Sequence, residues 1–87
     1  MNNQLLRRIE INPNILIGKP VVAGTRIPVF AVLDLLANDL EPKEIVNTYP
    51  DLTLKDIKAS VLFGSKLAYF EEPPLKIKER ARGAKRK

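Results

Sequence analysis

The chain has 87 residues, a formal net charge of +5, and neither cysteine nor histidine. That length allows one small domain with a marginal core, and the missing residue types exclude a disulfide and a structural zinc site. Dimerisation would supply further buried area, so we expect a homodimer. No apolar run approaches the ~20 residues of a membrane span, and the N-terminal segment lacks the apolar core of a signal peptide. We therefore expect a cytoplasmic protein with no membrane partner.

The positive charge is concentrated at the C-terminus. Residues 1–74 hold eight cations and nine anions, whereas residues 75–87 hold seven cations and one anion. Residues 28–70 have four cations and six anions. This charge is poorly suited to DNA, because duplex binding needs cations that replace counterions along the phosphate backbone. Residues 71–87 are rich in charge and poor in apolar side chains, so we predict a flexible basic tail after a domain of residues 1–70.

The N-terminal part of the chain is predicted to form a short β-arm. Leu6–Ile11 alternates loosely between apolar and charged residues and fits a strand, and Asn12–Asn14 is a turn signal. Ile15–Ile17 and Val21–Val22 are predicted as very short strands of a ribbon. Because an isolated ribbon is barely stable in water, it must pack on helices or pair with a second chain.

Glycines and prolines shape this arm. Gly18 and Gly24 suit backbone positions with positive φ, and Thr25 is expected to hydrogen-bond neighbouring backbone. Three prolines fix φ and remove hydrogen-bond donors: Pro13, Pro20 and Pro28.

Two helices are predicted to follow the arm. The first starts at Pro28, since proline is favoured at the first helical position, and ends at Asn38–Asp39. The second is short. It starts near Pro42, with Glu44 in its first turn where a carboxylate suits the helix dipole, and Pro50 stops it.

A third, longer helix is predicted after Thr53, which caps it together with Asp56 in a pattern close to a capping box. Gly64 either lets another helix approach closely or is simply tolerated, and Pro73–Pro74 forbids continuation. A short helix, a tight turn and a longer capped helix are typical of a helix-turn-helix. The predicted fold is therefore a mainly α, three-helix, helix-turn-helix-like domain with an N-terminal β-arm and a basic C-terminal tail.

Three strings of the sequence carry a family resemblance: GKPVV at Gly18–Val22, GTRIPV at Gly24–Val29 and YPDLT at Tyr49–Thr53. From about Ile9 to Phe70 the chain resembles the small prokaryotic domain-of-unknown-function family 433. The resemblance implies a helix-turn-helix-like fold and an antitoxin role, with a PIN-like nuclease as the usual partner.

The sequence offers little for catalysis. Its serines are Ser60 and Ser65, both within the third predicted helix, and its carboxylates are scattered over turns and helix ends. Asp51 and Asp56 are explained more simply as turn and capping residues than as an acid–base pair. We expect no enzymatic activity, no cofactor and no metal.

Five residues are candidate nucleic-acid contacts: Lys19, Arg26, Thr53, Lys55 and Lys58. The first two lie in the arm, where an exposed cation would be able to bind phosphate or a carboxylate of a partner. The alternative is a structural role, in which Arg26 binds a carbonyl or carboxylate within the fold or across a dimer. The other three begin the predicted recognition helix. No Arg, Asn or Gln, the residues that read base edges, occurs between Thr53 and Tyr69, so the lysines equally fit a solvated face.

The tail contains the candidate partner-binding residues Leu75, Ile77, Arg80 and Arg82. Leu75 and Ile77 share one face of a period-two segment that suits strand addition to a partner's sheet. A disordered solubilising end and a nonspecific phosphate-binding arm are the alternatives. The family resemblance favours the protein-binding alternative, because a PIN-like nuclease gathers carboxylates around a divalent metal and arginine pairs bidentately with carboxylates. Arg80 or Arg82 would then enter that acidic site.

The leading hypothesis is an antitoxin-like binding protein that neutralises a PIN-like nuclease, with operator binding by the dimer as autoregulation. The alternative is a stand-alone DNA-binding transcriptional regulator, and a third hypothesis is a structural adaptor that uses the same surface.

Overall fold

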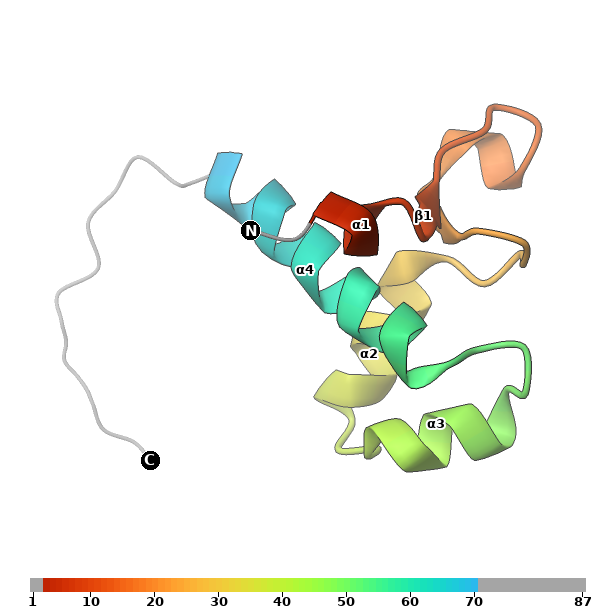
Figure 1. Cartoon of the computed structure of the whole chain (residues 1–87), viewed down its shortest axis with the longest axis vertical. Helices are drawn as coiled ribbons and strands as arrows, with labels where there is room; N and C mark the ends of the chain where they lie inside the picture. The colour runs from red at the N-terminus through yellow and green to blue at the C-terminus, as the bar shows by residue number, and fades with distance from the viewer. Residues whose placement is uncertain (1–2, 71–87) are drawn as a thin grey trace, which may run out of the picture.

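A computed structural model describes residues 3–70 of the chain. It is mainly helical, with a two-stranded antiparallel sheet near the N-terminus (Figure 1). The elements in chain order are α1 (Asn3–Leu6), β1 (Ile9–Glu10), the 3-10 helix η1 (Leu16–Gly18), β2 (Val21–Val22), α2 (Val29–Ala37), α3 (Pro42–Thr48) and α4 (Leu54–Phe70). Within this part of the chain no helix combines the length and the apolar character needed to cross a membrane.

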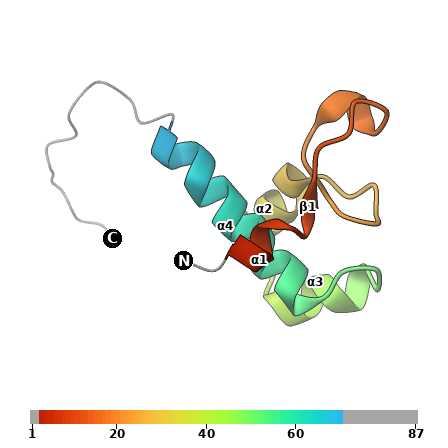
Figure 2. The same ribbon diagram turned by 45° about the horizontal axis from the view of Figure 1, so that its top comes forward.

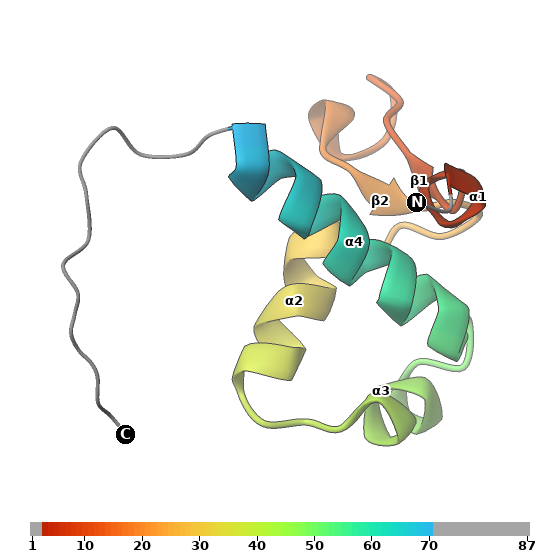
Figure 3. The same cartoon turned by 60° about the vertical axis from the view of Figure 1, so that its left-hand side comes forward.

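Helix α4 organises the domain, because α1, α2, α3 and β1 all pack against it. Figure 3 shows α2 crossing α4, with the two strands beside the same helix. The buried core contains residues from four of the elements and one connection. They are Val22 of β2, Val32 of α2, Ile45 of α3, Leu52 of the connection after α3, and Ile57 of α4. The predicted mainly helical domain with an N-terminal β-arm is confirmed, but it has four α-helices rather than three, because α1 precedes the arm.

The first predicted strand is shorter than expected. Leu6 belongs to α1, because the Arg7 and Arg8 N–H groups donate to the carbonyls of Gln4 and Leu5 and close a turn there (3.2 and 3.0 Å). Only Ile9 and Glu10 pair with β2, in the register Ile9↔Val22 and Glu10↔Val21. Extension is limited since β2 itself lies between Pro20, which has no N–H to donate, and the turn at Gly24.

The strand predicted at Ile15–Ile17 is wrong. The chain forms η1 instead, with Ile17 at φ 57° and 94% exposed, and Gly18 at φ 82°. The turn begins at Asn12, as predicted: its Oδ1 accepts the Asn14 N–H (2.8 Å) and its carbonyl accepts the Ile15 N–H (2.8 Å). These local hydrogen bonds outweigh the β propensity of the isoleucines.

The Gly24 loop is tight and closed by Thr25, as the sequence predicts. The Thr25 hydroxyl donates to the Val22 carbonyl (2.8 Å) and accepts the Ile27 N–H (3.0 Å), while the Val22 N–H donates to the Ile27 carbonyl (2.9 Å). Gly24 has φ 82°, the left-handed region. The loop therefore returns the chain to β2, with Arg26 directly before the residue that pairs with Val22.

Helices α2 and α3 agree closely with the prediction. Pro28 is the N-cap of α2 rather than its first helical residue, because its ψ of 151° is extended and it bridges Val21. Asp39, at φ 71°, follows the end of α2. Helix α3 begins at Pro42, where the Glu44 carboxylate accepts the Glu41 N–H (2.8 Å).

The start of α4 carries the predicted cap and an unpredicted ion pair. Asp56 Oδ2 accepts the Thr53 N–H (2.9 Å), and Thr53 Oγ1 accepts the Asp56 N–H (3.1 Å). The other carboxylate oxygen, Oδ1, accepts Arg8 Nη1 (3.0 Å), so one side chain caps α4 and binds the segment between α1 and β1. The Asp56 side chain is 9% exposed and that of Arg8 is 40% exposed.

Gly64 lies where α2 and α4 approach closely, which confirms the first of its two predicted roles. A Cβ added there would lie 3.0 Å from Leu33 Cδ1, so a larger residue would require Leu33 to move.

Replacing Asp56 with Ala should lower the free energy of unfolding by about 2–3 kcal/mol. Loss of a helix cap costs about 1 kcal/mol. The remainder comes from loss of the ion pair between the nearly buried Asp56 carboxylate and Arg8, which is partly solvated. Urea unfolding followed by circular dichroism measures the change. Asp51→Ala, at an exposed position nearby, is the matched control, and equal stability of the two variants would contradict the bridging role of Asp56.

Gly24→Ala should cost about 1 kcal/mol through backbone conformation alone, since no atom lies within 4 Å of an added Cβ. Gly24→Asn should lose less, because Asn tolerates the left-handed region. Thermal unfolding compares the two variants, and an Ala variant as stable as the parent would contradict the backbone explanation.

Candidate functional site

Two of the three candidate nucleic-acid residues at the start of α4 line one pocket. Lys55 and Lys58 line it with Gln4 and Leu5 of α1 and with Arg8, and its volume is about 260 Å³. Both lysines are exposed, as predicted. Figure 2 shows α1 lying against α4, so the lysines have the first helix of the chain as a neighbour. Arg8 was missed as a site residue because nothing in the sequence indicates its pairing with Asp56, 48 positions away.

Thr53 has a structural role at this position. Its hydroxyl oxygen accepts the Asp56 N–H and so caps the helix. Leu54 and Val61, seven residues apart on one side of α4, are 51% and 47% exposed. Lys58 lies between them on that side and is exposed as well. From its first residue onward, this side of α4 therefore presents apolar side chains around a lysine.

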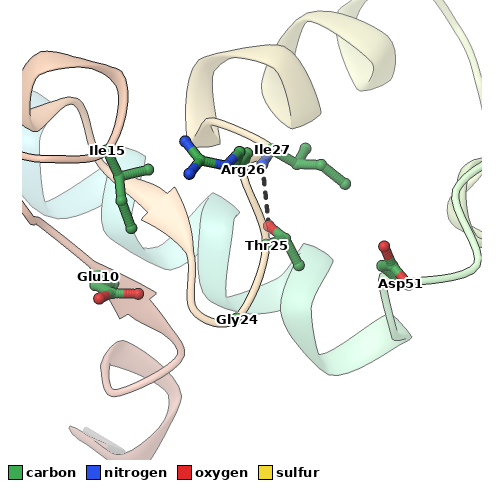
Figure 4. Close-up of a pocket in the computed structure, with 7 residues that line it drawn as sticks. All are labelled: Glu10, Ile15, Gly24, Thr25, Arg26, Ile27 and Asp51. Atoms are coloured by element: carbon green, nitrogen blue, oxygen red, sulfur yellow. Dashed lines mark hydrogen bonds between the residues drawn. The ribbon is translucent and has the colours of Figure 1, made fainter.

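Arg26 is exposed on the returning side of the Gly24 loop and borders two hollows. The larger one, about 600 Å³, is also lined by Glu10, Ile15 and Asp51 (Figure 4). The Arg26 guanidinium points away from Asp51 in this view, and across residues 3–70 the ion pair Arg8–Asp56 is the only one formed. Within that part of the chain the Arg26 guanidinium therefore forms no hydrogen bond or ion pair with a carbonyl or carboxylate.

The second hollow beside Arg26 is mostly apolar and about 400 Å³ in volume. Phe30, on the first turn of α2, is one of its lining residues and is 55% exposed. We call this region the Phe30 surface; its lining residues are Arg26, Ile27, Pro28, Phe30, Ala31, Asp34, Leu35 and Tyr49. On the other side of Phe30, a groove of about 170 Å³ contains Lys19 with Pro20, Leu33, Phe63 and Leu67. Sequence reasoning missed Phe30, because a helix that is apolar nearly all round does not indicate which residue stays exposed.

The structure thus separates the five candidate contacts. Lys55 and Lys58 lie together, Thr53 caps α4, and Lys19 and Arg26 lie at hollows on either side of Phe30. The candidate partner-binding residues of the tail, Leu75, Ile77, Arg80 and Arg82, fall outside the described residues. No group of three or more Asp or Glu side chains within residues 3–70 is placed to hold a metal ion.

The fold and these surfaces define a small helix-turn-helix-like domain in which a glycine-rich arm presents a cation beside an exposed aromatic residue. Residues 9–63 match the family model described as "Protein of unknown function (DUF433)", and the chain belongs to this family.

A solved structure gives the same result. The chain is similar to a DUF433 member protein from Anabaena variabilis, whose crystal structure was determined at 2.00 Å resolution. The TM-score is 0.68 and the sequence identity is 26%, over 78% of this chain and 67% of that one. A comparison with curated proteins found no significant match.

Proposed function

We propose that this protein is an antitoxin-like binding protein that neutralises a PIN-like nuclease, with operator DNA as a secondary ligand of the dimer. The observation that carries the proposal is the pair of exposed apolar side chains on α4. In a helix-turn-helix this helix would enter the major groove, where base edges are read mainly by Arg, Lys, Asn and Gln, and of these α4 has only lysines. Here the same face presents Leu54 and Val61, each about half exposed, on either side of Lys58.

Exposed apolar side chains favour a protein partner over a nucleic acid. Tyr49, Leu67 and Tyr69 add to the exposed apolar area of the domain. The charge of residues 28–70 also favours a protein partner. With four cations and six anions this segment is net negative, and a net negative segment disfavours binding to phosphate.

The position of α1 also supports this choice. Gln4 and Leu5 line the same pocket as Lys55 and Lys58, so a DNA groove could receive this side of α4 only together with α1. The nuclease is proposed as the partner on the family resemblance, and its inhibition is assigned to the tail. There, Leu75 and Ile77 would dock on an apolar surface while Arg80 or Arg82 pairs bidentately with the carboxylates that bind the nuclease's metal.

The double variant Arg80→Ala/Arg82→Ala of the full chain should lose most of its inhibition of the partner nuclease. Removal of a bidentate arginine from a carboxylate site leaves those carboxylates free to bind metal again. The measurement is RNA cleavage by the purified nuclease, titrated with each variant. Lys85→Ala/Arg86→Ala removes the same charge and is the matched control; equal inhibition by both variants would contradict the arginine-plug mechanism.

The second candidate function, a stand-alone DNA-binding regulator, is favoured by one observation: Arg8, Lys55 and Lys58 surround a single pocket. Two phosphate contacts through the lysines would contribute a slope of about −2 to the salt dependence of duplex affinity.

We expect the full-length Lys55→Ala/Lys58→Ala variant to bind duplex DNA within about two-fold of the parent protein, with an unchanged salt slope, because these lysines lie beside α1. Fluorescence anisotropy over a range of salt concentrations measures both quantities. A slope that becomes shallower by about 2 would instead support the regulator.

A further inference from the structure

We infer that the Phe30 surface is a two-fold interface between two copies of this chain, in which Arg26 of each copy pairs with Asp34 of the other. The inference does not depend on the nuclease partner. It begins with the arrangement of three residues along α2: Arg26 lies just before the helix, Phe30 on its first turn, and Asp34 one turn farther on. All three line one hollow, and all three are exposed.

This arrangement is self-complementary. In a two-fold interface, residue i of one copy contacts residue j of the other, and j contacts i. If two α2 helices pack antiparallel with Phe30 at the axis, the N-terminal end of one helix lies against the second turn of the other. Arg26 of each copy then meets Asp34 of its neighbour, and both ion pairs form around a central aromatic contact.

Charge distinguishes a second copy from other occupants. Arg26 and Asp34 bring one positive and one negative side chain to the surface, and across residues 3–70 neither forms an ion pair with another residue. Residues 75–87 carry seven cations and one anion, so the tail would bring like charge to Arg26. A strongly acidic partner would bring like charge to Asp34. A second copy offers the opposite charge to both residues at once.

The size of the domain favours the same occupant. A chain of this length without disulfides gains stability from an interface, and Phe30 together with Ile27, Pro28 and Tyr49 offers apolar area for one. Because Arg26, Phe30 and Asp34 are exposed, substitutions there leave the core of the single chain intact.

A charge-reversal experiment on the full-length chain tests the interface. Native mass spectrometry and light scattering should find the parent protein dimeric and both Arg26→Asp and Asp34→Arg monomeric, since each reversal creates two like-charge contacts. An equimolar mixture of the two variants should form a heterodimer with both pairs restored, and the double reversal in one chain should dimerise again. Phe30→Ser should be monomeric with an unchanged circular dichroism spectrum.

The control variant Lys43→Asp reverses an exposed charge on α3, outside this surface, and should stay dimeric. A monomeric parent protein would overturn the inference, as would single reversals that dimerise like the control or a mixture that remains monomeric. None of these outcomes depends on nuclease inhibition, so failure of the interface is distinguishable from failure of the proposed function.

Discussion

The fold depends most on the carboxylate of Asp56. One of its oxygens caps the longest helix at Thr53, and the other binds Arg8, which lies between α1 and β1. Because α4 contacts α1, α2, α3 and β1, fixing its first turn fixes the frame on which these elements pack. A nearly buried charge is tolerated here since both of its oxygens are paired.

The arm is fixed separately, by short-range hydrogen bonds. Thr25 closes the Gly24 loop, and the Val29 N–H donates to the Pro20 carbonyl (2.9 Å), which joins the arm to the start of α2. Arg26 and Phe30 therefore line one hollow from a backbone that hydrogen bonds hold in place. A backbone that is already ordered suits binding to another protein, because less ordering of the loop is needed on association.

The sequence predicts the parts of the fold that local chemistry controls. Prolines and caps place the starts of α2, α3 and α4 to within about one residue, and Gly18 and Gly24 have the positive φ expected of them. Longer-range features escape such reasoning. The pairing of Arg8 with Asp56 and the exposure of Phe30 depend on how the helices pack. The 3-10 helix η1 is a local feature, but it places Ile17 at φ 57°, a conformation that a β-branched side chain disfavours.

The most direct test of an antitoxin-like role is to recover the untagged native protein from its host with an antibody and to weigh the intact assembly. A PIN-like nuclease present in a fixed ratio to this chain, whose RNA cleavage resumes when the chain is removed, is the expected result. Recovery of the chain with duplex DNA and no nuclease would contradict that role and favour a transcriptional regulator.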